Sequence, residues 1–145
     1  QLRGEYLFGT QPGTATTNCS PSRSELPLYE DTYIRPFGGG YVMLVQGLGR
    51  SPFSAIIKYE SYDPNISVAG SEIGIPATAT GNADLRYNML GVGAFWQLTP
   101  AIRATLNYDI VGNETSDRLY SSSYRNDYSV DRKDNVFTFR LQYKF

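Results

Sequence analysis

The sequence predicts an all-β fold, an antiparallel transmembrane β-barrel to which residues 1–145 contribute a single region of about six strands. Three observations favour this fold class. Several segments of about ten residues alternate between apolar and polar side chains, which is typical of strands with one apolar face. Long and short connections alternate between these segments. The chain also closes on an alternating strand that ends in Phe145.

The composition is unusual in its 12 Tyr, its 14 Gly and its lack of His. Tyrosine and glycine suit short strands and turns better than a helical core. No window approaches the ~18 consecutive apolar residues that a transmembrane helix needs. The mean hydropathy of -0.35 does not separate a soluble β protein from a barrel, because polar side chains line a barrel lumen. A net charge of -1 provides no bulk attraction for nucleic acid, which we do not expect as a partner.

The N-terminal half contains three expected strands, residues 2–8, 41–48 and 53–63. The first and third alternate between apolar and polar residues with one exception each, Leu7 and Ile56. The second is apolar on both faces. The first and third patterns therefore predict a sheet with one polar face.

The C-terminal half contains three more expected strands, residues 84–98, 101–111 and 135–145. In the first, the apolar residues change parity between Met89 and Leu90. We expect a β-bulge there, because one extra residue reverses the facing of everything before it. The last strand has about the ten residues that a tilted strand needs to cross a bilayer.

The connections divide into two kinds. Residues 9–38, 64–83 and 112–134 form long polar stretches, whereas residues 49–52 and 99–100 form short turns. In an outer-membrane barrel the short turns lie on the periplasmic side and the long loops lie outside. This regularity favours such a barrel over a soluble sandwich, and it predicts that the last strand ends at the periplasmic rim.

The N-terminal residues and the single cysteine lead to two further expectations. Gln1-Leu2-Arg3 contains neither an initiator Met nor a signal segment, so we expect a removed signal or a longer protein. The lone Cys19 excludes an internal disulfide.

The alternation places a set of charged residues on the polar face, where they are candidates for lining a water-filled pore. They either tune which solutes pass or are solvated wall residues that pair across neighbouring strands. The candidates are Arg3, Glu5, Lys58, Glu60, Arg103, Asp109, Arg140 and Lys144.

Aromatic residues cluster near the strand ends. Amphipathic rings at the headgroup level form the aromatic girdle of membrane barrels, although tyrosine is also simply a good strand residue. The girdle candidates are Tyr6, Tyr59, Tyr62, Trp96, Tyr108 and Tyr143.

Catalytic and metal sites find no support in the sequence. It has no His, a single Cys and no Gly-x-Ser-x-Gly elbow, so the usual nucleophile–base pairs are missing. The acidic residues between Asp117 and Asp134 match no calcium-loop spacing. We expect no enzyme activity, no cofactor and no metal.

Two stretches resemble a known family. The ending Asn135-Val136-Phe137-Thr138-Phe139-Arg140-Leu141-Gln142-Tyr143-Lys144-Phe145 resembles the closing strand of outer-membrane porins. The segment Ile57-Lys58-Tyr59-Glu60-Ser61-Tyr62-Asp63-Pro64-Asn65 is similar to a strand end of the phosphate-selective porins O and P, in the form typical of Bacteroidetes. The glycine-containing hairpin from Leu90 to Tyr108 looks like the penultimate hairpin of the same proteins.

The resemblance implies a porin in the outer membrane of a Gram-negative bacterium. It implies a passive diffusion channel for small hydrophilic solutes, with anions such as phosphate among the candidates. Family barrels have roughly sixteen strands, so the chain would be the C-terminal part of a larger barrel or one contributor to a shared one. A structural or anchoring barrel without an open pore is the alternative function, and a soluble ligand-binding β protein is a third.

The resemblance also implies partners. These are outer-membrane lipid and lipopolysaccharide, other copies in a homotrimer or a larger outer-membrane complex, and the barrel-assembly machinery during biogenesis. That machinery would recognise the closing strand through Phe139, Leu141, Tyr143 and Phe145.

Overall fold

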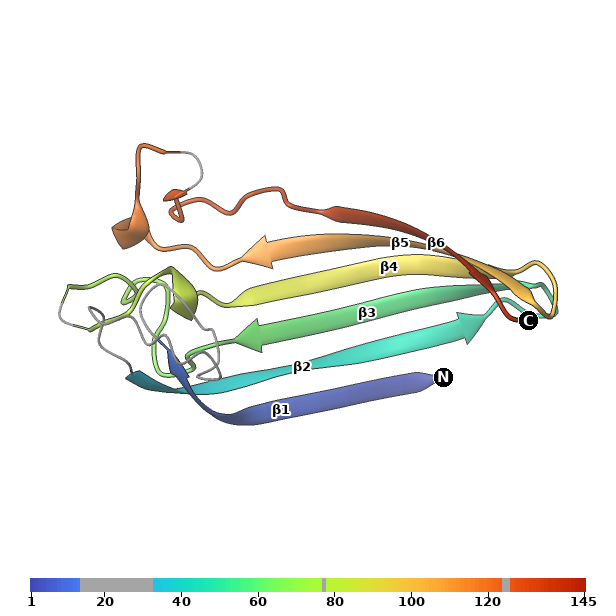
Figure 1. Cartoon of the computed structure of the whole chain (residues 1–145), viewed down its shortest axis with the longest axis horizontal. Helices are drawn as coiled ribbons and strands as arrows, with labels where there is room; N and C mark the ends of the chain where they lie inside the picture. Colours follow the sequence, from blue (N-terminus) through green and yellow to red (C-terminus); the bar gives the residue numbers. More distant parts are fainter. Residues whose placement is uncertain (14–32, 77, 124–125) are drawn as a thin grey trace.

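The computed structural model describes residues 1–13, 33–76, 78–123 and 126–145 as one all-β arrangement (Figure 1). Cys19 lies outside the described residues. Six strands form one antiparallel sheet in chain order: β1 (Leu2–Gly13), β2 (Tyr33–Gly47), β3 (Phe53–Asp63), β4 (Tyr87–Gln97), β5 (Ile102–Asn113) and β6 (Val136–Tyr143). Two short 3-10 helices, η1 (Asn82–Asp84) and η2 (Asp117–Leu119), complete the described elements. The all-β, antiparallel prediction is therefore confirmed at the level of the sheet.

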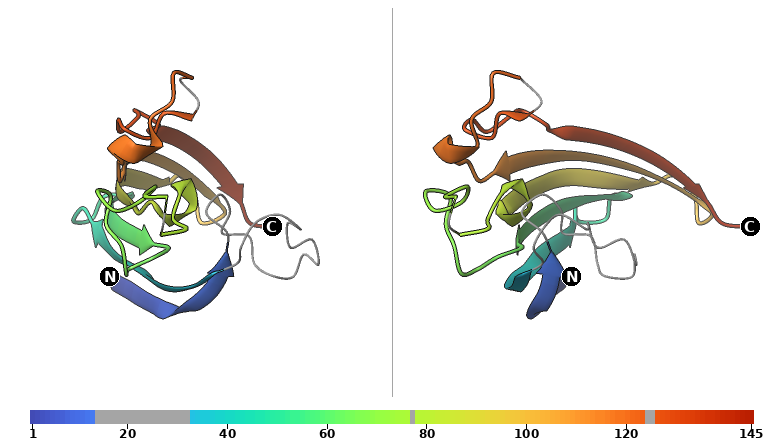
Figure 2. Two further views of the ribbon diagram at one scale, coloured as in Figure 1. Left: turned by 90° about the vertical axis from the view of Figure 1, so that its left-hand side faces the viewer. Right: turned by 60° about the vertical axis from the view of Figure 1, so that its left-hand side comes forward.

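The sheet is strongly curved and is not closed. Figure 2 shows the strands curling around a concave side that opens between β1 and β6. Within the described residues β1 pairs only with β2, and β6 pairs only with β5. The outer edges of both strands therefore remain without a strand partner in the described part of the chain.

Two short turns join strands at the end of the sheet where Phe145 also lies (Figure 1). In the turn between β2 and β3, Leu48 N–H donates to the Phe53 carbonyl over 3.0 Å. Gly49 in this turn has a φ of +64°, a left-handed conformation that favours glycine. We call this end the turn end, and the opposite end, which carries the described residues of the ranges 64–86 and 114–135, the loop end.

Strands β1 and β2 run further toward the loop end than expected. Their pairing continues to Gly13 and Tyr33, so residues 9–13 and 33–38 of the predicted loop 9–38 lie in the sheet. The prediction underestimated these strands because Thr10-Gln11-Pro12 and the Gly38-Gly39-Gly40 run lack the alternating apolar pattern on which it relied.

The predicted bulge near Met89 is wrong. Strand β4 pairs residue by residue with β3 and β5 without an inserted residue, from Tyr87 to Trp96. Tyr87 and Met89 therefore lie on the concave face, opposite Tyr62 and Glu60. The apolar residues change parity because they lie on the concave face at this end of β4 and on the convex face along the rest of the strand. The backbone pairing stays regular throughout.

The two faces of the sheet differ in chemistry. Register places apolar side chains in one continuous layer on the convex face, and nearly all of them are exposed. The members are Leu2, Tyr6, Phe8, Val42, Leu44, Phe53, Ile57, Tyr59, Leu90, Val92, Trp96, Leu106, Tyr108, Ile110, Phe137, Phe139, Leu141 and Tyr143. By contrast, Ile73 and Ala83 are the hydrophobic residues buried in the described part of the chain, and both lie at the loop end. An apolar patch of this extent needs a covering, since monomeric soluble proteins rarely expose one.

Candidate functional site

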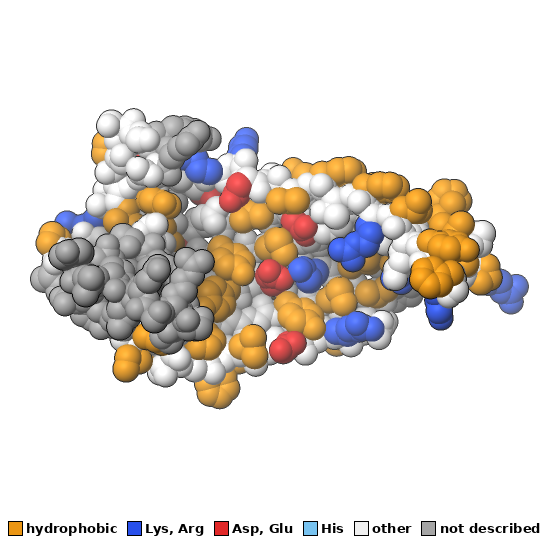
Figure 3. Space-filling model, in the orientation of Figure 1, with side chains coloured by type: hydrophobic (Ala, Val, Ile, Leu, Met, Phe, Trp, Pro, Cys, Tyr) orange, Lys and Arg blue, Asp and Glu red, His pale blue; other side chains and the backbone are white. Residues whose placement is uncertain are grey.

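The concave face carries most of the charged side chains that the alternation assigned to the polar face. Seven of the eight candidates share this face by strand register, namely Arg3, Glu5, Lys58, Glu60, Arg103, Asp109 and Arg140. Lys144 follows the end of β6, where its N–H donates to the Ala101 carbonyl over 2.8 Å. Figure 3 shows charged side chains along the middle of the face turned to the viewer, which is the concave one in Figure 2.

A polar cluster lies at the centre of this face. Lys58 forms an ion pair with Glu60 over 2.7 Å, and Asn107 Nδ2 donates to Asp109 Oδ1 over 2.7 Å. Gly91 lies between the two pairs, in register with both Lys58 and Asp109. A side chain at that position would meet Asp109 Oδ1 at 2.6 Å, so the glycine makes room for the carboxylate.

The turn end of the concave face is cationic. Arg103 Nη2 donates to Gln142 Oε1 over 2.7 Å, and its guanidinium lies 5.4 Å from the centroid of the Phe95 ring. Arg140 lies one row further along the sheet, in register with Thr105. The acidic residues of the concave strand face, Glu5, Glu60 and Asp109, lie nearer the middle of the described strands. The charges are therefore partly sorted along the strands.

A buried ion pair ties the segment after β3 to the concave side. Arg35 of β2 has the same facing as Gln11 and Phe37, and its Nε lies 2.6 Å from Asp84 Oδ1. Only 3% and 0% of these two side chains are exposed. Asn65 Nδ2 and Gly81 N–H also donate to the Asp84 carboxylate, over 2.8 Å each. In Figure 2 this segment lies within the curl of the sheet at the loop end.

This ion pair was not predicted from the sequence. Arg35 lies inside the expected loop 9–38, and Asp84 is the first residue of an expected strand. No local pattern marks the pair, because its partners lie on different elements that are distant in the chain. The two hydrogen bonds between Gly81 and Asp84 are the contacts of short sequence range at this pair.

The segment after β5 packs against the same loop structure through polar contacts. Glu114 accepts hydrogen bonds from Gly70 N–H over 3.0 Å and from Arg86 N–H over 3.1 Å. The buried Ser116 hydroxyl donates to the Ile73 carbonyl over 2.7 Å. The described parts of residues 64–86 and 114–129 thus form one hydrogen-bonded assembly at the loop end.

Most girdle candidates lie on the convex face, but Tyr62 does not. Register places Tyr6, Tyr59, Trp96, Tyr108 and Tyr143 on the convex side. Near the turn end, Trp96 stacks on Phe53 with 5.4 Å between centroids.

Tyr62 does not share the face of the other girdle candidates. Its ring lies on the concave side against Phe37 and Tyr87, and its hydroxyl donates to Gln11 Oε1 over 3.4 Å. Tyr62 follows Lys58 and Glu60 at even spacing, so the period of two already assigned it to their face. Its position near a strand end was the misleading signal.

The closing strand presents its apolar row outward. Phe139, Leu141 and Tyr143 are each more than 60% exposed on the convex face, and Phe145 is fully exposed beyond the strand. The structure therefore leaves these four residues accessible along the edge strand.

Within the described ranges no group of three or more His, Cys, Asp or Glu side chains could hold a metal ion. No helix in the described part of the chain is long and apolar enough to cross a membrane.

Comparisons with protein-family models, with curated proteins and with solved structures found no match to this chain.

Proposed function

We propose that this chain forms part of the wall of a transmembrane β-barrel in a bacterial outer membrane and serves as a porin. Small hydrophilic solutes would diffuse passively along the concave face, and anions such as phosphate are the first candidates to test. The observation that carries the proposal is the division of one curved sheet into an apolar convex face and a charged concave face.

The location of the apolar side chains, on the convex face of the curved sheet, separates this proposal from a soluble ligand-binding barrel. A soluble barrel fills its interior with apolar side chains and turns polar ones to water. The apolar layer lies outside in this sheet, as in membrane barrels, and Lys58, Glu60 and Asp109 lie inside. The reversed polarity favours a lipid environment for the convex face.

Backbone pairing sets a further requirement on the proposed barrel. Unpaired strand edges are not tolerated in hydrocarbon, where no water replaces the missing hydrogen bonds. The outer edges of β1 and β6 must therefore pair with additional strands, from the same polypeptide or from other copies. Completed barrels would then assemble into a homotrimer or a larger outer-membrane complex.

The closing strand is the proposed recognition element for barrel assembly. The exposed convex row Phe139, Leu141 and Tyr143 continues to Phe145 at an unpaired edge. An assembly machine that adds a strand or binds an apolar row could reach these side chains before the barrel closes.

The decisive experiment is conductance after reconstitution of the purified protein in planar bilayers. We expect stepwise currents and a reversal potential that depends on the salt gradient. Arg140→Gln should shift the selectivity toward cations, because it removes a positive charge from the proposed lumen. Arg50→Gln, in the exposed turn between β2 and β3, is the matched control and should leave selectivity unchanged. Absence of any current across the bilayer would reject the channel.

A structural or anchoring barrel without an open pore is the second candidate. The observation in its favour is the buried Arg35–Asp84 pair, which holds residues 64–86 on the concave side at the loop end. A segment fixed in that position narrows any passage along the concave face. A membrane-inserted protein that carries no current, in wild type and in an Asp84→Asn variant alike, would favour this candidate.

A further inference from the structure

A pocket of about 630 Å³ lies at the loop end, between residues 70–76 and residues 115–118. The two segments follow β3 and β5, and both lie at the same end of the sheet in Figure 1. The hydrogen bond from the buried Ser116 hydroxyl to the Ile73 carbonyl holds them together. Small-molecule sites in proteins typically enclose about 300–1,000 Å³, so the size of this loop pocket suits a small ligand.

Two glycines allow the walls of the loop pocket to approach each other. A Cβ at Gly70 would collide with the Thr115 carbonyl oxygen. Gly74 has a φ of +89°, which L side chains rarely adopt, and a Cβ there would meet the Leu119 side chain at 2.8 Å. The contact between the two segments therefore depends on glycine at both positions, and it shapes the pocket before any ligand arrives.

The loop pocket offers several polar groups that the described residues do not use. Ser71, Asp117 and Arg118 are exposed at it, and their side chains form no hydrogen bond or ion pair in the described part of the chain. The carboxylate only accepts hydrogen bonds, the guanidinium only donates them, and the hydroxyl does both. Donors and acceptors thus lie side by side, and the one negative charge balances the one positive charge.

This combination favours a neutral ligand with several hydroxyl groups. An anion would lie against Asp117 and a cation against Arg118, and like charges repel at such distances. An acyl chain would find little apolar surface, since Pro76 is the apolar side chain among the described lining residues. Adjacent sugar hydroxyls can donate to a carboxylate and accept from a guanidinium at the same time. The carbon face of the sugar ring can pack on Pro76.

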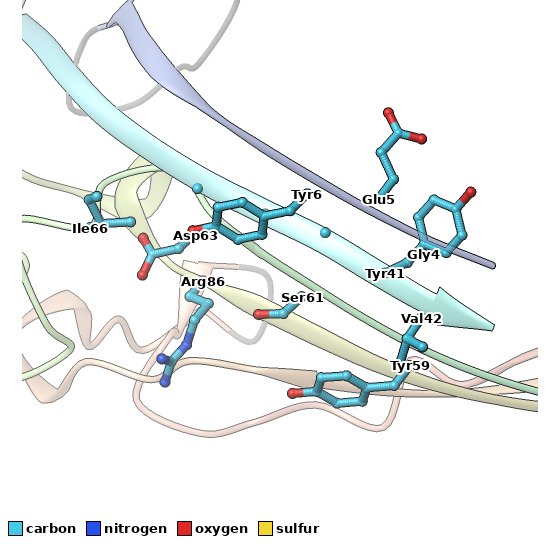
Figure 4. Close-up of a pocket in the computed structure, with 13 residues that line it drawn as sticks. Gly4, Glu5, Tyr6, Tyr41, Val42, Tyr59, Ser61, Asp63, Ile66 and Arg86 are labelled. Atoms are coloured by element: carbon cyan, nitrogen blue, oxygen red, sulfur yellow. The ribbon is translucent and has the colours of Figure 1, made fainter. Parts of the chain in front are cut away.

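The convex face has a second hollow near the loop end, and a side chain of the protein already covers its floor. Figure 4 shows Tyr6, Asp63 and Arg86 at this hollow. A Cβ at Gly38 or at Gly40 would meet the Tyr6 side chain at 3.0 Å, so the tyrosine ring lies directly over both glycines. The convex hollow therefore offers a ligand no open floor.

We propose that the loop pocket binds a neutral saccharide, with adjacent sugar hydroxyls held by Asp117 and Arg118. Binding at this site needs no pore, so the inference goes beyond the proposed function. In the proposed orientation the loop end faces the outside of the cell. The saccharide then comes from the medium, as a solute held outside the sheet, or from the sugar chain of a neighbouring lipopolysaccharide. Both sources present the same hydroxyl chemistry.

Saturation-transfer NMR on the full chain tests the proposal, in a detergent without sugar headgroups such as lauryldimethylamine oxide. The first probes are the methyl pyranosides of glucose, galactose and mannose, and the second is lipopolysaccharide core oligosaccharide freed of its lipid. Transfer to the ring protons of a methyl pyranoside indicates a saccharide from the medium. Transfer to the core oligosaccharide alone indicates lipopolysaccharide. Absence of transfer to every sugar probe would overturn the proposal.

Variants of the two charged residues locate the binding. Arg118→Gln and Asp117→Ala should each lower the affinity for the bound sugar about tenfold, the effect of losing one charge-assisted hydrogen bond. Both side chains are exposed, so neither substitution removes a buried contact. Lys133→Gln replaces another exposed cation in the segment after β5 and should leave the affinity unchanged. Wild-type affinity in both pocket variants would reject the site.

Competition with other small solutes tests the ligand class. Free alanine is a zwitterion that could pair with both charges of the pocket, and inorganic phosphate is an anion. We expect neither of them to displace the bound pyranoside. Displacement by either solute at concentrations below that of the sugar would overturn the assignment to saccharides.

Failure of this inference and failure of the proposed function have different signatures. Sugar binding by a chain that carries no current would keep the saccharide site and reject the channel. Current across the bilayer without sugar binding would reject the saccharide site alone.

Discussion

Arg35 on β2 and Asp84 in η1 form a buried ion pair of 2.6 Å that joins the concave side of the sheet to the segment after β3. The Asp84 carboxylate also accepts hydrogen bonds from Asn65 and Gly81, so both of its oxygens have partners. Arg35 Nη2 donates to the Ala79 carbonyl over 3.3 Å, whereas its buried Nη1 has no partner in the described part of the chain. The arrangement holds a polar loop on the sheet without an extensive hydrophobic core beneath it.

Asp84→Asn should loosen residues 64–86. Breaking a buried ion pair leaves an uncompensated charge and costs about 3–5 kcal/mol. We expect this cost to lower the free energy needed to open the segment. Amide hydrogen exchange of residues 64–86 in detergent micelles should rise accordingly. Lys58→Met is the control, because removing a partly exposed pair costs about 1 kcal/mol or less. Wild-type exchange rates in Asp84→Asn would contradict the anchoring role.

Two adjacent positions on β6 should differ in how strongly an introduced positive charge destabilises the folded protein. Leu141→Arg places a cation on the convex face and should destabilise the folded protein in lipid by about 2–4 kcal/mol if the site lies at mid-membrane. Gln142→Arg places the same cation on the concave face, where it loses the hydrogen bond from Arg103 and faces that like charge, and should cost only about 1 kcal/mol. Urea unfolding from lipid vesicles measures both. Equal costs at the two sites would refute the assignment of the faces.

The same comparison on β5 provides an independent check. Leu106→Arg should behave as Leu141→Arg, and Thr105→Arg should behave as Gln142→Arg, because register pairs Leu106 with Phe139 on the convex face.

Two glycines on the concave side of β4 should differ in their tolerance of alanine. A Cβ at Gly93 would meet the Leu106 carbonyl at 2.5 Å, so the neighbouring backbone must shift, at a cost of about 1–3 kcal/mol. A Cβ at Gly91 meets the Asp109 carboxylate, which can rotate away. Unfolding of Gly93→Ala and Gly91→Ala in micelles should show the larger loss for Gly93→Ala. The reverse order would mean that the strands are not packed as described.

The loop that contains Asp127 should respond to acid. Hydrogen bonds from the Ser129 hydroxyl over 2.6 Å and from its N–H hold the pKa of Asp127 below its ordinary value of 3.8, and Arg132 contributes in the same direction. Because the folded pKa is lowered, these contacts stabilise the loop above the ordinary pKa. They are lost as the pH falls through the folded value.

An NMR titration of the Asp127 carboxyl carbon measures this effect. Ser129→Ala should raise the midpoint toward the ordinary value, because it removes the hydroxyl donor. Ser123→Ala, elsewhere in the same loop, should leave it unchanged. An unaltered midpoint in Ser129→Ala would assign the lowered pKa to another group.

The sequence by itself determined the two-faced sheet. Side chains alternate with a period of two along any strand, so facing can be read from neighbouring residues without knowledge of the partners. This local rule placed Lys58, Arg103 and Asp109 on one face and Leu106 and Leu141 on the other. The same rule places Tyr62 with Lys58 and Glu60, whereas the expectation that Tyr62 joins the girdle followed its position near a strand end.

Only the tertiary structure decided how far the strands extend and what lies on the concave face. The extension of β1 and β2 depends on pairing between distant segments, since Gln11 and Arg35 lie in polar or glycine-rich surroundings that carry no strand pattern. The Arg35–Asp84 pair and the packing of Tyr6 over Gly38 and Gly40 arise from contacts between segments distant in the chain. Such contacts depend on register and curvature, and no short window of sequence contains them.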